Sequence, residues 1–252
     1  MGNSSRRKFI ATQAPLATVA AASLTAIHTQ AQQAEAKLVF GIIGCGGIMS
    51  LHVQGLVNRH DDVEIAWLCD VDDAQTERMS RFVREEFQSK APKRTRRYED
   101  VIQDKNVDAI VIATPHHWHA PIALAAMREG KHVYIEKPIS HVYNEGHAII
   151  KAAKEYGCVV QQGSQMRNSP VTAKAEKLLK EGILGEVKVA RAWTAETRSV
   201  AKPVPDSATP SNEDYDRWLG PAPKRAFNRQ RFHGSWRMFQ DYGNGEIGEW
   251  YS

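Results

Sequence analysis

Cysteine is scarce in this sequence, and its spacing argues against two kinds of site. The 252 residues contain only Cys45, Cys69 and Cys158, an odd number without a Cys-x-x-Cys pair. This pattern indicates neither a disulfide framework nor a zinc site, so we interpret each cysteine as a small buried hydrophobic residue. Cys45 and Cys69 end neighbouring predicted strands and could approach one another. Internal repeats and low-complexity tracts are also absent.

Acidic residues are missing from the first 34 positions of the chain. There, Ser5-Arg6-Arg7-Lys8-Phe9-Ile10 precedes an apolar, alanine-rich stretch up to Ile27, a pattern typical of a twin-arginine export signal. A membrane anchor is the alternative, but polar residues and Pro15 dilute the stretch. We therefore predict a cleaved signal peptide over residues 1–31, recognised by the twin-arginine export machinery. The protein would then be periplasmic or otherwise exported, with no stable membrane span after processing.

A strong positive charge is absent once this signal is set aside. The net charge of the whole chain is +4, and loss of residues 1–31 with their three basic side chains lowers it to +1. The remaining basic cluster at residues 90–97 is most simply a solvated loop. The composition therefore does not support a nucleic-acid partner.

What the sequence does contain is a glycine cluster at the end of an apolar run, within Leu38–Ser50. This pattern predicts a strand, a phosphate-binding turn and the start of a helix. Gly44 allows the tight turn, and Gly46 lets the backbone approach a pyrophosphate that faces the helix N-terminus. The third position of this fingerprint holds Met49 instead of glycine, so the match is partial.

An acidic residue is expected about 20 positions after such a turn, past a second strand. Asp70 is found there, directly after the apolar stretch Glu64–Cys69. A carboxylate at this place can accept hydrogen bonds from both ribose hydroxyls and would repel a 2′-phosphate, which favours NAD while leaving NADP possible. Asp70 alone would fit a solvated loop equally well, and the cofactor prediction depends on its pairing with the glycine turn.

Strands and helices alternate through about residue 163. We expect a helix over Asp73–Phe87, a basic loop over Ala91–Arg97, a strand over Ala109–Ala113, a helix over Pro121–Gly130, a strand over His132–Ile135, a helix over Val142–Tyr156 and a last strand over Val159–Gly163. This order predicts an α/β fold, a Rossmann-type doubly wound parallel sheet over residues 37–163 with its ligand at the strand carboxyl ends.

The pattern changes after residue 163. A helical segment over Thr172–Glu181 precedes Val187–Trp193, whose period-two alternation predicts a strand with two differently used faces. A proline-rich excursion follows over Val200–Pro223. We therefore predict that residues 164–252 begin an α+β open-sheet domain.

Three loops would follow sheet strands into the cofactor crevice. They are Thr114–His119, Glu136-Lys137-Pro138 and Gln162–Arg167. Lys137 follows an apolar strand and precedes a proline, so its backbone should be rigid. From this position its amine could transfer a proton to or from the substrate. An exposed lysine after a strand is the alternative, and in isolation it is the better interpretation.

The histidines of the first loop do not indicate a metal site. His116, His117 and His119 come from one short loop without acidic support, a poor geometry for zinc. We expect His119 to cap the following helix or to form hydrogen bonds within the crevice, and the other two to contribute to loop packing.

Taken together, these motifs resemble the family of glucose-fructose oxidoreductases and inositol dehydrogenases. The resemblance covers about Val39–Trp250 and includes Ala113-Thr-Pro-x-x-x-His119, Glu136-Lys-Pro138, Gln165-x-Arg167, Trp218-Leu-Gly-Pro and Asp241-Tyr-Gly-Asn-Gly. It implies a nicotinamide cofactor, a sugar or cyclic polyol as substrate, and proton transfer by Lys137 next to Glu136. We also expect a homo-oligomer for the full-length parent.

The candidate site residues are then as follows. The predicted cofactor contacts are Gly44, Gly46, Gly47, Ile48, Met49, Asp70, Thr114, Pro115, His119, Glu136, Lys137 and Gln165. The candidate substrate contacts are Arg167, Arg231, His233, Trp236 and Asp241. Two alternatives to a dehydrogenase stay open: a glycosidase or epimerase that oxidises and re-reduces its substrate, and a sugar-binding protein with a structural dinucleotide.

The end of the sequence departs from this family. In similar proteins the stretch after the Asp-Tyr-Gly-Asn-Gly motif continues to a catalytic histidine and further strands, whereas this sequence ends at Ser252. We therefore expect a C-terminally truncated substrate domain. We interpret the phenylalanines of Arg225–Tyr251 as core residues, but we expect this aromatic segment to expose apolar surface without further strands and the last 60 or so residues to be held loosely.

Overall fold

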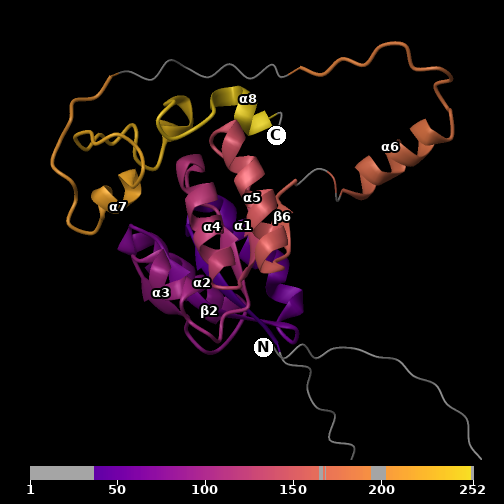
Figure 1. Cartoon of the computed structure of the whole chain (residues 1–252). Coiled ribbons are helices and arrows are strands. Elements are labelled where there is room, and N and C mark those ends of the chain that lie inside the picture. Colours follow the sequence, from indigo (N-terminus) through magenta and orange to yellow (C-terminus); the bar gives the residue numbers. More distant parts are fainter. Residues whose placement is uncertain (1–36, 165–166, 168, 194–202, 251–252) are drawn as a thin grey trace, which may run out of the picture. The chain divides into compact units, whose positions relative to one another are not determined.

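The structure is a computed structural model, and it describes residues 37–164, 167, 169–193 and 203–250 (Figure 1). The predicted signal peptide and the candidate cofactor contact Gln165 lie outside these ranges. Among the described residues, no helix is both long enough and apolar enough to cross a membrane.

A sheet of six parallel strands forms the centre of the described structure. In chain order the strands are β1 (Leu38–Ile43), β2 (Val63–Cys69), β3 (Lys93–Thr95), β4 (Ala109–Ile112), β5 (His132–Ile135) and β6 (Val160–Gln162). Their order in the sheet is β3-β2-β1-β4-β5-β6, which confirms the predicted doubly wound fold. The order reverses between β1 and β4, where open sheets of this type bind ligands outside the strand carboxyl ends.

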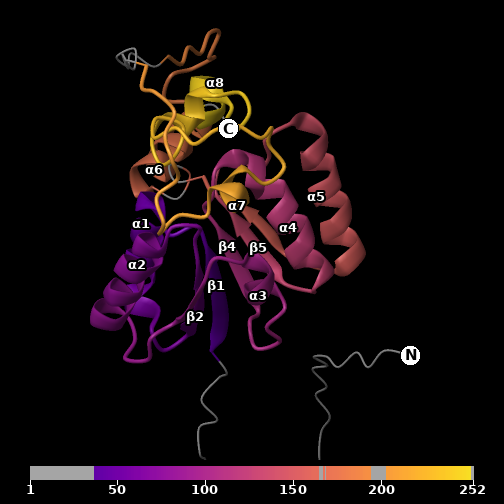
Figure 2. The ribbon, with the colours of Figure 1, turned by 90° about the vertical axis from the view of Figure 1, so that its left-hand side faces the viewer.

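Helices cover both faces of this sheet. One face carries α1 (Gly47–Leu56) and α2 (Asp73–Glu86), and the other carries α3 (Tyr98–Ile102), α4 (His119–Arg128) and α5 (Tyr143–Tyr156) (Figure 2). The strands β1, β4 and β5 are therefore buried on both faces, which is why they are continuous apolar runs in the sequence.

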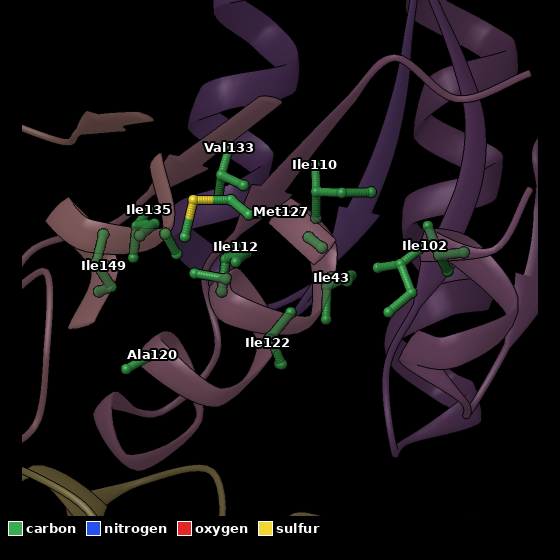
Figure 3. Packing of buried hydrophobic residues seen from close by; sticks show 14 of the residues in the cluster. Ile43, Ile102, Ile110, Ile112, Ala120, Ile122, Met127, Val133, Ile135 and Ile149 are labelled. Atoms are coloured by element: carbon green, nitrogen blue, oxygen red, sulfur yellow. The ribbon is translucent and has the colours of Figure 1, made fainter. Parts of the chain in front are cut away.

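Two apolar clusters fill the space between the helices and the sheet. In the cluster under α4 and α5, Ile110, Ile112 and Met127 are fully buried (Figure 3). Truncation of one such side chain to alanine typically costs about 2–5 kcal/mol. Gly41 of β1 is part of this packing, because a Cβ atom there would lie 2.3 Å from Cγ1 of Val101. These contacts fix the strands whose ends form the site.

Two secondary-structure predictions were wrong. The basic loop contains β3, a three-residue edge strand that pairs with β2 between Trp67 and Cys69. The predicted strand over Val187–Trp193 does not form: these residues follow α6 (Pro170–Lys180), are exposed, and pair with no described strand. A single alternating segment needs a partner strand to satisfy its backbone groups, and the described residues supply none.

The segment 203–250 packs more tightly than the sequence indicated. It contains α7 (Tyr215–Leu219) and α8 (Gly245–Trp250), and its buried residues form an aromatic cluster. Phe227, Phe232, Trp236 and Tyr242 are each at most 8% exposed. Burial of the two phenylalanines agrees with the sequence, whereas the expectation of exposed apolar surface was wrong for Trp236 and Tyr242. The rings pack against one another, mostly tilted or edge to face, with centroids roughly 4.5–6.5 Å apart, the range of favourable aromatic pairs.

Candidate active site

A cleft lies at the carboxyl ends of β1, β2 and β4. Its empty volume, counted out into the open mouth, is about 1130 Å³. Nine predicted site residues line it: Gly44, Gly46, Gly47, Ile48, Asp70, Thr114, Pro115, His233 and Trp236. Residues from both the sheet and segment 203–250 therefore form its walls.

The glycine turn leaves room for an anion. Gly44 has a φ of 90°, and a Cβ atom there would lie 2.7 Å from the Ala113 backbone, so only glycine fits. A Cβ atom at Gly46 or Gly47 would meet nothing within 4 Å, which leaves open space in front of the turn. The helix α1 that begins here has neither a side-chain cap nor an acidic residue in its first turn. Its N–H groups and its positive dipole end are therefore available to a phosphate.

Asp70 lies beside this turn and its carboxylate is held in place. Oδ2 accepts a hydrogen bond from the Cys45 N–H at 2.7 Å, and Oδ1 accepts one from the Asp72 N–H at 3.0 Å. Burial raises the pKa of Asp70, against the effect of these two donors. Burial also raises the pKa of Cys45 and Cys69, whose thiols are free, as expected for small hydrophobic residues.

Met49 lies elsewhere than predicted. Its side chain projects from α1 into the core cluster between this helix and the sheet. It is fully buried there and does not line the cleft. A glycine at this third position of the fingerprint would let the helix pack closer to the sheet. Met49 instead fills the space between them.

His119 joins two loops of the site. It is the first residue of α4, and its ring lies 2.7 Å from the Pro138 carbonyl oxygen and 2.8 Å from that of Thr114. Burial lowers the pKa of His119 to about 4, so the ring is neutral at pH 7 and donates to one of these oxygens. His119 thus connects the loops of Thr114 and Pro138 behind the surface, and it neither lines the cleft nor caps the helix.

Glu136 is the centre of a network behind the cleft. Its Oε1 atom lies 2.7 Å from His52 Nε2 and 3.3 Å from the Tyr134 hydroxyl, and its Oε2 atom accepts from the Lys137 N–H. Burial works to raise the pKa of Glu136, but the contacts with His52 and Lys137 together outweigh it and lower the pKa. A Cβ atom at Gly163 would lie 2.9 Å from Oε1, so glycine keeps this position open.

Lys137 is paired with a carboxylate that the sequence did not reveal. Its Nζ donates to Glu249 Oε2 at 2.7 Å and to the Glu249 carbonyl oxygen at 2.9 Å. The other oxygen, Oε1, lies 3.0 Å from His116 Nε2 and 2.9 Å from Arg237 Nε. Burial would raise the pKa of Glu249, but these partners outweigh it and bring the pKa to about 2. The carboxylate is therefore ionised at neutral pH, with Lys137 held against it.

The candidate substrate contacts separate into two groups. His233 and Trp236 line the cleft, and the Arg237 guanidinium lies 4.3 Å from the Trp236 ring centroid. Arg231 and Asp241 are directed elsewhere, into ion pairs with Asp206 and Arg225. Arg167 is exposed, next to residues outside the described ranges.

Sequence reasoning missed several residues of this site. Glu249 and Arg237 contact one another, and Arg237 also lines the cleft, as do Arg96 and Arg217. Glu249 lies 112 positions after Lys137, so no local spacing links the two. The signal that was available was the aromatic and basic density of residues 225–251, which indicated contacts without identifying them.

The residues present fit a dinucleotide. The open space in front of Gly46 and Gly47 suits a pyrophosphate, and the fixed carboxylate of Asp70 faces the same cleft. The glycine turn and the carboxylate thus occur together at the strand ends where the fold binds nucleotides.

Comparisons with known proteins agree with this arrangement. Residues 38–164 match the family model described as an oxidoreductase family with an NAD-binding Rossmann fold. Residues 171–251 match the model described as the C-terminal alpha/beta domain of the same oxidoreductase family. The second match covers the part that we predicted as the start of a substrate domain.

Individual relatives cover parts of the chain. It is 34% identical over 107 residues to levoglucosan dehydrogenase of Pseudarthrobacter phenanthrenivorans, a match that covers 40% of this chain and 27% of that protein. It is 28% identical over 145 residues to scyllo-inositol 2-dehydrogenase (NAD⁺) of Bacillus subtilis, covering 58% and 41%.

A solved structure shares the fold. The WlbA dehydrogenase of Bordetella pertussis, in complex with NADH and UDP-GlcNAcA, matches with a TM-score of 0.54 and 25% identity over 60% of this chain and 44% of that one. The chain thus spans less than half the length of each of these three proteins. From its two family matches and the geometry of its cleft, the chain belongs to the oxidoreductase family of glucose-fructose oxidoreductases and inositol dehydrogenases, with an NAD-binding Rossmann fold.

Proposed function

We propose that the protein is an NAD-dependent oxidoreductase of a sugar or cyclic polyol, with Lys137 as its general acid or base. The observation that carries this proposal is the partly buried ion pair of Lys137 and Glu249 at the carboxyl end of β5. Similarity to a levoglucosan dehydrogenase and a scyllo-inositol dehydrogenase supports the substrate class. A nicotinamide bound in the cleft would supply the hydride acceptor or donor.

The residues of the chain have distinct roles in this proposal. The N–H groups at Gly46 and Gly47 hold the pyrophosphate, and Asp70 accepts hydrogen bonds from the adenosine ribose. The preference for NAD follows from Asp70, because its charge repels a 2′-phosphate.

Proton transfer is assigned to Lys137. Its Nζ exchanges a proton with the substrate hydroxyl as the carbon–hydrogen bond breaks or forms. Glu249 orients Nζ through the 2.7 Å hydrogen bond, and Glu136 positions the backbone of the same loop. Glu249, like Glu136, acts through Lys137 and is a positioning residue.

The test is hydride transfer to or from NAD with a panel of sugars and cyclic polyols, followed by the absorbance of the reduced cofactor. Lys137→Ala should lower kcat by orders of magnitude and leave NAD affinity unchanged, because Lys137 acts on the substrate proton. Lys151→Ala, an exposed lysine on α5, is the matched control and should behave like the unmodified chain.

Other outcomes of this experiment separate the alternatives. Product formation without net reduction of NAD would indicate a redox-cycling glycosidase or epimerase. Saturable sugar binding with no turnover, unchanged by Lys137→Ala, would indicate a binding protein and contradict the proposal.

We also propose export by the twin-arginine route, on the sequence of residues 5–10 and the apolar stretch that follows. A fusion of residues 1–36 to a reporter should reach the periplasm. Replacement of Arg6 and Arg7 by lysine should retain it in the cytoplasm, and export that persists in that variant would contradict this proposal.

A further inference from the structure

A second group of ionisable side chains contains neither Lys137 nor Glu249, although one of its members, His233, also lines the cleft. Asp72, Glu213 and His233 each offer one ligand atom, and these atoms lie within 4.8 Å of one another. Asp72 caps α2, whereas the other two come from segment 203–250. The backbones are fixed here, because residues 72 and 213 form an antiparallel bridge flanked by the Asp214 N–H bond to the Val71 carbonyl oxygen.

One carboxylate oxygen in this group has no protein partner. Glu213 Oε1 accepts from Arg229 Nη1 at 2.9 Å, but Oε2 is buried and finds no hydrogen-bond donor among the described residues. The Glu213 side chain is only 4% exposed, so little water reaches it. Buried carboxylate oxygens are normally hydrogen-bonded or bound to a metal. The orphaned oxygen therefore points to a ligand.

Hydrogen bonds place Asp72 and His233 so that both could bind the same ligand. Asp72 Oδ1 accepts from the Ala74 N–H and from Asn212 Nδ2, which fixes the carboxylate. Asp72 Oδ2 lies 2.8 Å from His233 Nε2, so a carboxylate oxygen and an imidazole nitrogen already face one another. A cation between them would replace one proton and hold both atoms.

We infer that Asp72, Glu213 and His233 bind a divalent transition-metal ion, of which Zn²⁺ fits best. One imidazole and two carboxylates form a mixed nitrogen and oxygen set, which suits Zn²⁺ better than the all-oxygen preference of Mg²⁺ and Ca²⁺. Three protein ligands leave a fourth position for water. The ion would join α2 to segment 203–250, and this inference does not depend on the proposed reaction.

Nothing in the sequence pattern indicates this site. Its ligands lie at positions 72, 213 and 233, far from any metal-binding spacing, and we had expected no metal site. The loop that raised the question, His116 to His119, is instead buried among packing partners.

The test is titration of the full chain, freed of metal by a chelator, with Co²⁺ followed by visible absorption and with Zn²⁺ followed by calorimetry. One equivalent should bind, with Co²⁺ bands typical of low coordination number. Glu213→Gln and His233→Gln should each weaken binding more than about tenfold. His60→Gln removes an exposed histidine outside the group and should bind like the unmodified chain.

Arg229→Gln tests whether weaker metal binding in the other variants is caused by loss of folding. It removes the Arg229 contact with Glu213 but keeps all three ligands, so metal affinity should stay the same or rise. Near-ultraviolet circular dichroism without metal monitors the fold of each variant. Absence of stoichiometric binding, equal binding by Glu213→Gln, or equal weakening by Arg229→Gln would overturn the inference.

Discussion

Two regions that follow the Rossmann sheet differ in how they are stabilised. In residues 170–193, α6 and the extended residues after it bury no side chain, although Val171, Leu179, Ile183 and Trp193 are apolar. In residues 203–250, an aromatic cluster is buried and is tied to the sheet loops by hydrogen bonds.

The difference shows where stability comes from. The ion pairs Lys180–Glu176 and Lys177–Glu181 on α6 are exposed, and water and salt screen such pairs, so they contribute little to stability. The aromatic cluster instead removes several large rings from water, and each buried ring contributes on the order of 2 kcal/mol. Packing, more than helix propensity, separates the two regions.

The largest expected effect comes from Trp218→Ala in the aromatic cluster. Trp218 is 4% exposed and stacks near Tyr215, Phe232 and Tyr242, so its removal leaves a large cavity. We expect a loss of about 3–5 kcal/mol in the free energy of unfolding of segment 203–250. Hydrogen exchange resolved along the chain measures this, and unchanged protection in that segment would contradict the packing described here.

An intermediate effect is expected from acid, through His117 at the junction of the two regions. His117 Nε2 donates to the Trp218 carbonyl oxygen at 2.9 Å, and burial lowers its pKa to about 4. The unfolded chain protonates His117 near pH 6.5, whereas the folded chain does so only near pH 4. The neutral His117 therefore contributes fully to the free energy of unfolding above pH 6.5, and this contribution is lost as the pH falls toward 4. The loss is about 3 kcal/mol.

Denaturant unfolding between pH 7 and pH 4 checks this prediction. His117→Gln should reduce the slope of the free energy of unfolding against pH, leaving the part due to His119, whose pKa burial also lowers to about 4. His60→Gln, which changes an exposed histidine, should leave the slope unchanged. The same slope in His117→Gln and in the unmodified chain would show that another group causes the acid sensitivity.

The smallest effect is expected on α6. Leu179→Ala should change the free energy of unfolding by less than about 0.5 kcal/mol, because the side chain is half exposed and packs in no core cluster. Limited proteolysis should also cut within residues 170–193 before it cuts within 203–250. Early cleavage in 203–250 instead would restore the expectation that the whole C-terminal part is loosely held.

The Rossmann sheet could be predicted because each of its main strands is indicated by residues that are neighbours in the sequence. The strand over His132–Ile135 was predicted with its observed bounds, and Ala109–Ala113 and Val159–Gly163 with ends one residue too long. The first two are largely apolar stretches, whereas Val159–Gly163 is apolar only at its two valines and ends at a glycine. The short strand β3 was missed because Lys93–Thr95 is an edge strand without an apolar face.

The remaining features depend on contacts between distant positions. The alternation of Val187–Trp193 identifies a segment able to pair but does not supply the partner that pairing requires. The glycine turn and Asp70 were found from their spacing, whereas the partner of Lys137 lies 112 positions away. The sequence therefore predicted the cofactor side of the site better than the substrate side.

The central claim is that the cleft at the glycine turn binds NAD through Gly46, Gly47 and Asp70. Titration of the 252-residue chain with NAD⁺ and NADP⁺, followed by calorimetry, tests it without requiring a substrate. We predict one equivalent of bound NAD⁺, weaker binding of NADP⁺, and loss of this preference in Asp70→Ala. Absence of dinucleotide binding by the folded chain, or an unchanged preference in Asp70→Ala, would contradict the account.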